Sequence, residues 1–179
     1  MVRASAPGKC ILFGEHAVVY GEPAVAVAID ARVQVSMAPC KGEWKLDGNP
    51  LITERHPHVV SLRDAVVGAE SPPHSLMVQS ELFPAAGLGS SAALSAATCA
   101  GLLQLVGDEM DSERIATLSH LAEAAAQNGR ASPVDTSTAT VSYTNLRAHE
   151  TEADLVCRLL LEQKNKHSDV EHFHAITPN

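Results

Sequence analysis

Alternating hydrophobic and polar positions predict a β-rich start, over residues 2–38. Val33 to Met37, "VQVSM", alternates at period two, as a strand with one buried face does. Just before it, Ala24 to Ile29, "AVAVAI", has no polar position and predicts a strand buried on both faces. Another strand is predicted at Ser75 to Leu82, "SLMVQSEL". These patterns place the predicted sheet in the first half of the chain.

Three segments have the spacing of helices. Residues 57–69 keep helical spacing up to a glycine, and Ser90 to Val106 is a helix of small residues that also ends at a glycine. Asp111 with Ser112 predicts the cap of a further helix, which runs to about Gln127. The order of strands, helix, strand, Gly-Ser loop, helix and helix predicts an α+β domain.

Composition and charge narrow the class of protein. The 179 residues carry a net charge of -8, which disfavours nucleic acid as a partner. No apolar run approaches the roughly 20 residues of a membrane span, and the N-terminus lacks the features of a signal peptide. Four cysteines without CxxC pairing indicate small apolar residues in a reducing compartment. We therefore expect a cytoplasmic protein with no membrane partner.

The character of the chain changes after Thr140. Val141 to Lys166, "VSYTNLRAHETEADLVCRLLLEQKNK", resembles the in-frame translation of a sequencing-library adapter. No glycine follows Gly129, and charged residues and histidines become denser. The alternative is a C-terminal helix with an irregular end. We expect residues 1–140 to be one truncated domain and residues 141–179 to be a non-native tail without selected function.

The stretch "FPAAGLGSSAAL" carries the main candidate chemistry. Gly87 and Gly89 permit a tight backbone that turns several N–H groups toward one point. Ser90 and Ser91 begin a helix, whose N-terminus adds unpaired donors and a partial positive charge. The run therefore predicts an anion site, with hydroxyls available to phosphate oxygens or Mg²⁺. The alternative is a strand-to-helix turn with serine caps and alanines suited to close packing.

Two better-known phosphate motifs do not account for this run. It is not G-x-x-x-x-G-K-[ST], because no lysine follows the second glycine. Gly87, Gly89 and Ala92 satisfy G-x-G-x-x-A, the dinucleotide fingerprint. That fold needs a strand after the helix, with an acidic residue near its end, and here a second capped helix follows instead. A Rossmann fold is therefore disfavoured.

Two further segments hold candidate polar residues. "SAPGKCILFGEHAVVYGEPAVAVAI" places Lys9 after Pro-Gly, and Glu15 and His16 between strand-like runs. "GRASPVDTSTAT" places Asp135 in a predicted loop rich in hydroxyls. Taken singly, Lys9 reads as a solvated turn residue and His16 as a structural histidine. Asp135 alone reads as a cap or an Asx-turn residue.

Together, and in this order, the three segments resemble the GHMP kinase family, which includes galactokinase, homoserine kinase, mevalonate kinase and phosphomevalonate kinase. The resemblance covers about residues 4–140, including P-x-x-G-L-G-S-S-A-A from Pro84 to Ala93 and S-P-x-D from Ser132 to Asp135. "APGKCILFGEHAVVYG" is most similar to the archaeal and bacterial mevalonate kinases. The resemblance implies the N-terminal, ATP-binding domain of the family, a two-layer β/α domain like that of a ribosomal protein. It also implies that the C-terminal domain is missing.

The resemblance implies catalytic and substrate roles as well. Lys9 would neutralise charge near the transferring phosphoryl group. Asp135 matches the base that takes the proton from the substrate hydroxyl. Glu15 and His16 fall in the segment that approaches mevalonate. Phosphoryl transfer mainly needs alignment and neutralisation of oxygen charge, so this set is chemically suitable.

ATP and Mg²⁺ are the cofactors that the resemblance implies. Ser91 would bind Mg²⁺ with an acidic residue that the family usually has within E-x-x-x-x-G. Here Glu123 lies one position too far from Gly129, and Ala124 holds the matching place. If Asn128 is one residue more than the family pattern has, Glu123 is the residue that matches the family's metal ligand. The residues implied to cradle the triphosphate are Pro84, Gly87, Leu88, Gly89, Ser90, Ser91 and Ala92.

The implied reaction is the ATP-dependent phosphorylation of (R)-mevalonate to 5-phosphomevalonate in isoprenoid precursor synthesis. We expect the truncated chain to be inactive alone, and a homodimer of the full-length protein is left open. One rival is another GHMP kinase, acting on phosphomevalonate, homoserine or a sugar, although "FGEHAVVYG" favours mevalonate. A second rival is a non-catalytic nucleotide-binding module, which has no need of Lys9 and Asp135 beside a phosphate loop.

Overall fold

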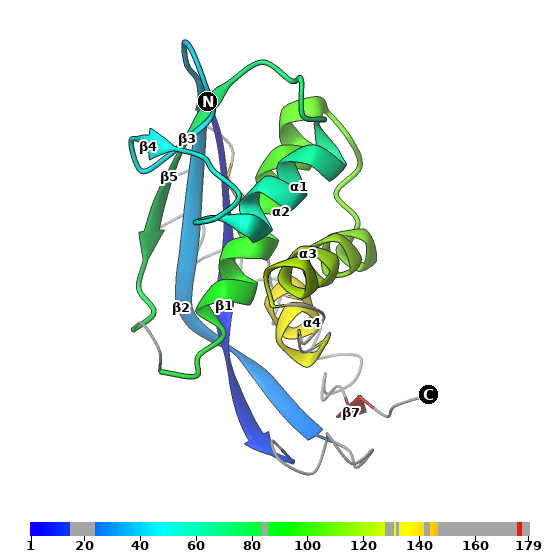
Figure 1. Ribbon diagram of the computed structural model, residues 1–179. Helices are drawn as coiled ribbons and strands as arrows, with labels where there is room; N and C mark the ends of the chain where they lie inside the picture. The colour runs from blue at the N-terminus through cyan, green and yellow to red at the C-terminus, as the bar shows by residue number, and fades with distance from the viewer. Residues whose placement is uncertain are drawn as a thin grey trace.

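The chain folds as two layers, a sheet with helices on one of its faces (Figure 1). A computed structural model describes residues 1–14, 24–83, 86–127, 131, 133–141, 144–146 and 175–176. Within these residues the strands lie in the order β4-β3-β5-β2-β1-β6, and β7 pairs with β2. The predicted α+β, two-layer architecture is confirmed.

Two long strands form the centre of the sheet. β1 (Val2–Phe13) and β2 (Ala24–Pro39) are antiparallel, and β5 (His74–Ser80) pairs with the other edge of β2. Val33 and Val35 are buried while the residues on either side are half-buried, which confirms the predicted period-two strand. The short strands are β3 (Lys45–Leu46), β4 (Asn49–Pro50), β6 (Thr144–Leu146) and β7 (Ala175–Ile176).

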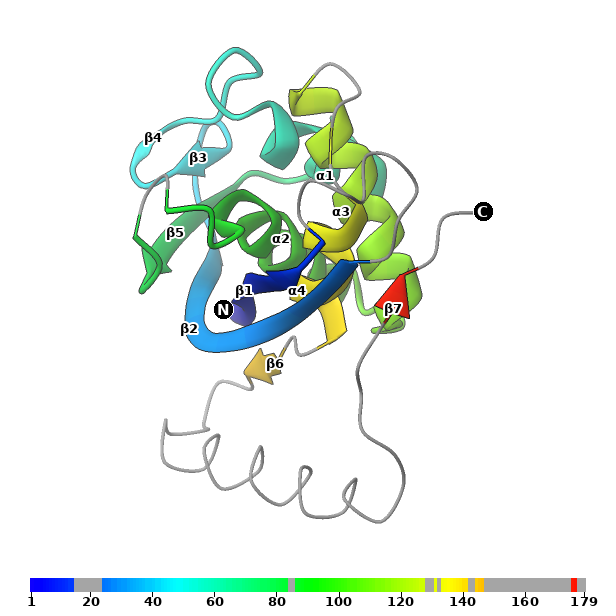
Figure 2. The ribbon, with the colours of Figure 1, turned by 90° about the horizontal axis from the view of Figure 1, so that it is seen from below.

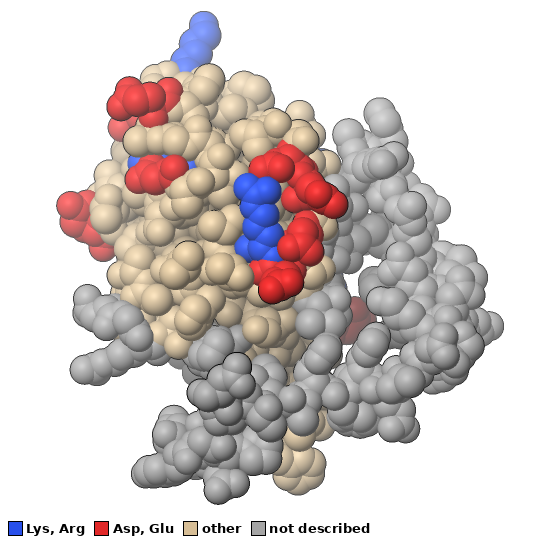
Figure 3. Space-filling model, turned by 90° about the vertical axis from the view of Figure 1, so that its right-hand side faces the viewer, with Lys and Arg blue, Asp and Glu red and all other residues tan. Residues whose placement is uncertain are grey.

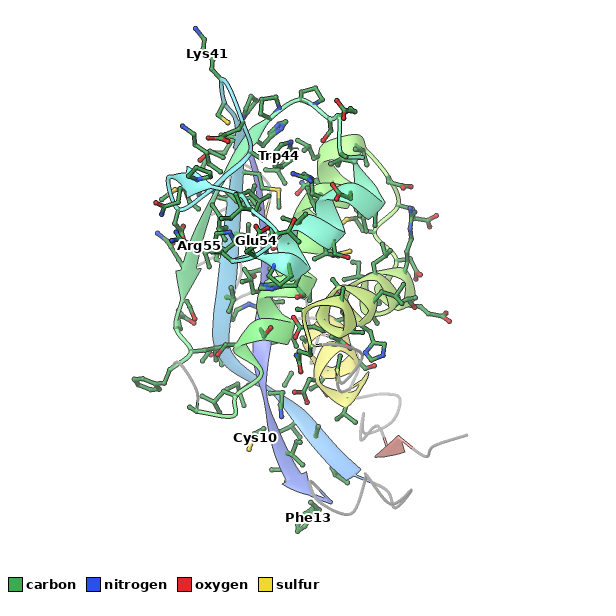
Figure 4. The ribbon with its side chains drawn as sticks, viewed as in Figure 1. Cys10, Phe13, Lys41, Trp44, Glu54 and Arg55 are labelled. Carbon is green, nitrogen blue, oxygen red and sulfur yellow. The ribbon has the colours of Figure 1, made fainter. Side chains whose placement is uncertain are left out.

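The strand predicted at residues 24–29 is present, but its expected burial on both faces is wrong. Val25 to Val27 are half-buried, and Ala28 is exposed. This stretch pairs with the end of β1, where Phe13 is 73% exposed and points away from the domain (Figure 4). The two strands run beyond the helical layer here (Figure 1), so no described helix covers their small apolar side chains.

The three predicted helices are confirmed at nearly their predicted bounds. They are α1 (Pro57–Val66), α2 (Ser90–Val106) and α3 (Ser112–Ala126). Asp111 caps α3 as predicted, because its carboxylate accepts the backbone N–H of Arg114 at 2.8 Å. None of the described helices is both long enough and apolar enough to cross a membrane.

A fourth helix, α4 (Pro133–Val141), occupies the segment that the sequence predicted to be a loop. Asp135 lies in the first turn of this helix, so its placement in a loop is corrected. Proline suits the first position of a helix, because its fixed φ is helical and its missing N–H would have no partner there. α4 contacts α3, α2 and β1, and Figure 2 shows it beside these elements.

The core lies between the sheet and α2, the central helix. Ala96, Ala97 and Ala100 on α2 are fully buried. A Cβ added to Gly101 would lie 2.7 Å from Cε of Met37 on β2. The small residues of α2 therefore let the helix lie close against the sheet.

Short pieces of the predicted tail fall within the described residues. β6 pairs with β1 at Arg3 to Ser5, and β7 pairs with the start of β2. Most of residues 141–179 lies outside the described residues, as do Glu15, His16 and Pro84. The absence of function in the tail therefore stays a prediction.

Candidate functional site

The glycine-serine loop leads directly into α2. Gly87 and Gly89 have φ values of 71° and 70°, in the left-handed region that glycine adopts without steric cost. Gly89 is the N-cap of α2, and no side chain caps the helix. The first N–H groups of the helix therefore have no acceptor within it, and the positive end of the helix dipole lies at the loop. The predicted helix start at Ser90 and Ser91 is confirmed.

An open cleft of about 380 Å³ lies at this helix start. Residues from three parts of the chain line it, namely the loop with the first turn of α2, the C-terminal end of α3, and α4. Backbone donors and two carboxylates thus border the same space. The lining residues are 86–92, Glu123, Gln127, Asp135 and Thr136.

Lys9 on β1 reaches Asp135 on α4. The ammonium Nζ of Lys9 lies 3.1 Å from Oδ1 of Asp135, and the two side chains are 7% and 29% exposed. The family resemblance implies that these two residues act at one site, and the structure brings them together. A Cβ on Gly89 would lie 2.7 Å from Cγ of Lys9, so the lysine stem passes directly against the loop. Asp135 lines the cleft, whereas Lys9 is buried and is not among the lining residues.

β1 is shaped to bring Lys9 to the loop. The register between β1 and β2 breaks at Gly8, where residues 29–31 lie opposite this one residue. The backbone N–H of Lys9 donates to the carbonyl oxygen of Leu88 at 2.9 Å. A Cβ on Gly8 would lie 2.8 Å from that same oxygen and 2.5 Å from Cδ2 of Leu82. Glycine at position 8 is therefore needed for the strand to approach the loop so closely.

Glu123 on α3 is a buried carboxylate, 3% exposed, that accepts hydrogen bonds from neutral donors. Oγ of Ser91 lies 2.7 and 2.8 Å from its two oxygens. Oγ of Ser95 donates to Oε1 at 2.5 Å, and Nε2 of Gln127 donates to Oε2 at 2.9 Å. No ion pair joins Glu123 to a lysine or arginine among the described residues. A carboxylate with oriented oxygens and no cation beside it suits a hard metal ion.

Among the hydrogen-bond partners of Glu123, sequence reasoning missed Ser95 and Gln127. Ser95 lies one helical turn after Ser91, and Gln127 lies one turn after Glu123. Residues four positions apart share a helix face, so this spacing was the available signal. Ala124, which occupies the usual position of the family's acidic residue, is not among the lining residues, whereas Glu123 is.

His58, near the start of α1, does not supply Glu123 with a fixed positive charge. Burial lowers the pKa of His58, the Glu123 carboxylate opposes this shift, and His56 adds to it. Nε2 of His58 is buried and has no hydrogen-bond partner among the described residues. The net direction favours the neutral imidazole.

Away from the cleft, two more ion pairs are formed by residues close together in the sequence, Arg63 with Asp64 and Arg114 with Asp108. Basic side chains on the face shown in Figure 3 are flanked by acidic ones, and Arg114 pairs with Asp108 at 2.8 Å. In the part of the chain that the structure describes, no cluster of three or more His, Cys, Asp or Glu residues could hold a metal ion. A cation at Glu123 would therefore need ligands from Ser91, water or a bound anion.

Comparisons with known proteins agree with this geometry. The family model of the GHMP kinases N terminal domain matches residues 58–143. A mevalonate kinase of Archaeoglobus fulgidus is 42% identical over 142 residues, which cover 74% of this chain and 48% of the relative. The chain belongs to the GHMP kinase family.

Further relatives of this GHMP kinase chain extend the match. A mevalonate kinase of Methanothermobacter thermautotrophicus is 36% identical over 165 residues, covering 85% of this chain and 54% of the relative. The crystal structure of the Methanococcus jannaschii mevalonate kinase matches with a TM-score of 0.67 and 25% identity, over 86% of this chain and 57% of that one. The predicted resemblance is confirmed. The chain spans about half the length of the curated relatives it matches.

Proposed function

We propose that this chain is the ATP-binding part of a mevalonate kinase, which transfers the γ-phosphoryl group of ATP to (R)-mevalonate. The observation that carries the proposal is the convergence of an uncapped helix start, Glu123 and the Lys9–Asp135 pair at one cleft. The mevalonate kinases among its relatives support this choice of substrate.

In this proposal the glycine-serine loop binds the phosphates of ATP. The N–H groups at the start of α2 have no acceptor within the helix, so they are available to phosphate oxygens. The helix dipole adds attraction for the anion. The residues of this cradle are Pro84, Gly87, Leu88, Gly89, Ser90, Ser91 and Ala92.

Ser91 and Glu123 are the proposed ligands of the Mg²⁺ that accompanies ATP. Their oxygens suit a hard cation, and Glu123 is buried with only neutral donors around it. When bound, Mg²⁺ neutralises charge on the phosphate oxygens. It commonly takes only one or two protein carboxylates, with water and phosphate oxygens as its other ligands.

Asp135 is the proposed base for the mevalonate hydroxyl. Its carboxylate lines the cleft, and the ion pair with Lys9 restricts its orientation. The ammonium of Lys9 adds positive charge on the side of the cleft where the phosphoryl group is transferred. Glu15 and His16 are proposed to contact mevalonate on the resemblance alone.

The full-length protein provides the test of the reaction. We expect ADP release from ATP with mevalonate, and none with phosphomevalonate, homoserine or galactose. Release with one of the other acceptors alone would reassign the substrate within the family. Binding of Mg²⁺ and ADP without turnover on any acceptor would instead support the non-catalytic nucleotide-binding module.

We also propose that residues 1–140 form the functional domain and that residues 141–179 contribute nothing to the site. The family match ends at residue 143, and among the described residues the last one that lines the cleft is Thr136. Removal of residues 147–179 should leave the affinity for Mg²⁺ and ADP unchanged. A marked loss of that affinity would give the tail a role.

A further inference from the structure

We propose that Ser95 and Gln127 are positioning residues, which hold the Glu123 carboxylate in the orientation that a metal ion requires. Both would act through Glu123. The inference rests on the proposed function, in which Glu123 and Ser91 bind the divalent cation of ATP.

The two donors hold the two oxygens of Glu123 separately. Ser95 lies on α2, is fully buried, and donates to Oε1 at 2.5 Å. Gln127 lies at the C-terminal end of α3 and donates to Oε2 at 2.9 Å. With one donor on each oxygen, the carboxylate plane cannot rotate without breaking a hydrogen bond.

Counting lone pairs shows why these two bonds matter for metal binding. An ionised carboxylate offers about four lone-pair positions. Ser95 and Gln127 each occupy one, and the Ser91 hydroxyl lies within hydrogen-bond distance of both oxygens. A Ser91 oxygen that binds a metal ion must turn a lone pair toward it, and its own proton away. The bonds from Ser95 and Gln127 can persist, so Glu123 keeps its orientation with a lone pair free toward Ser91.

The neutrality of the donors also matters. A hydroxyl and an amide orient the carboxylate but leave its negative charge uncompensated. A lysine or arginine in either place would cancel the charge that attracts the cation. Partners that orient a metal ligand typically change metal affinity about 10- to 100-fold when they are removed.

Manganese titration tests the inference without relying on turnover. The Kd of Mn²⁺ in the presence of ADP is measured from free Mn²⁺ by electron paramagnetic resonance. Ser95→Ala and Gln127→Met should each raise this Kd about 10- to 100-fold, while the affinity for ADP without metal stays unchanged. Methionine keeps the length of glutamine without its donor. Gln127 is exposed, so Gln127→Met should fold even if Ser95→Ala does not. The Kd of Mn²⁺ for Gln127→Met then tests the positioning role by itself.

Thr98→Val is the matched control. Thr98 lies on the same helix as Ser95, is equally buried, and its hydroxyl has no hydrogen-bond partner among the described residues. Its removal should leave the Mn²⁺ affinity unchanged. An equal loss in Thr98→Val and Ser95→Ala would mean that any buried deletion in α2 disturbs the site, and would overturn the positioning role.

The remaining outcomes separate the inference from the proposed function. If wild type binds Mn²⁺ with ADP, Glu123→Gln abolishes this binding, and Ser95→Ala and Gln127→Met bind normally, the positioning role is wrong and the metal site stands. If wild type does not bind Mn²⁺ with ADP, the proposed metal site fails, and the inference fails with it.

Discussion

The ammonium of Lys9 lies 3.1 Å from the carboxylate of Asp135, with the lysine side chain 7% exposed and the aspartate 29% exposed. The lysine is buried and the aspartate lines the cleft. The ion pair therefore holds a cleft residue through a residue in the interior of the domain. An enclosed ammonium without a partner is strongly destabilising. Asp135 therefore has a structural role beside its proposed catalytic one, and variants can separate the two.

Asp135→Asn in the full-length protein should lower turnover by about 100-fold or more, because an amide cannot take the proton of the acceptor hydroxyl. Binding of Mg²⁺ and ADP should change little. Steady-state kinetics and an ADP titration measure these two quantities. Turnover at the wild-type level would remove Asp135 as the base.

The structural role of Asp135, as the partner of Lys9, predicts how variants change the free energy of unfolding of the chain. Asp135→Asn should destabilise it, because Lys9 loses its counter-charge. The double variant Lys9→Met, Asp135→Asn should recover part of the lost free energy of unfolding, because no unpaired charge then remains buried. Urea unfolding of the single and double variants gives the comparison. Strictly additive losses would show that the ion pair has no coupling.

Gly87→Ala and Gly89→Ala should differ in stability although their backbone angles are nearly the same. Both positions have positive φ, so alanine costs about 1–2 kcal/mol at each. A Cβ at Gly87 meets nothing within 4 Å, but one at Gly89 would lie 2.7 Å from Cγ of Lys9. Gly89→Ala should therefore have the lower free energy of unfolding. Equal values in urea unfolding would mean that the Lys9 stem moves aside freely.

Cys99 should resist alkylation in the folded protein. Burial raises the pKa of its thiol to about 12, so almost no thiolate forms at pH 8. Cys10, which points off β1 in Figure 4, and Cys40 are half-buried and should react faster. Iodoacetamide labelling with peptide mass spectrometry compares the three sites. Rapid native labelling of Cys99 would show that α2 opens from the sheet.

His58 should make the fold less stable in mild acid. Its pKa is lowered by burial and by His56, against the pull of Glu123, so the unfolded chain binds the proton more readily. Neutral His58 therefore contributes its full stabilisation above pH 6.5, the ordinary pKa of histidine. This stabilisation is lost as the pH falls below that value. His58→Gln should flatten this loss. Urea unfolding between about pH 5 and 8 tests it, and an unchanged slope in His58→Gln would assign the loss to other groups.

Most helix and strand bounds could be predicted from the sequence, because their signals are local. The small-residue run of α2 ends at Gly107, and Asp111 caps the next helix, as expected. α4 was missed because its threonine-rich sequence has low intrinsic helix propensity. Val134 and Ala139 are buried, so packing stabilises a helix that the local sequence alone does not favour.

By itself the sequence determined which residues can carry the chemistry, since a glycine-serine run at a helix start is readable from adjacent positions. The meeting of Lys9 with Asp135 was expected only from the family resemblance, and the tertiary structure decided it through the register break at Gly8 and the first turn of α4. The tertiary structure alone placed Ser95 and Gln127 on Glu123. Spacing within one helix shows which residues share a face, but only the packing of α2 against α3 decides that these two faces meet.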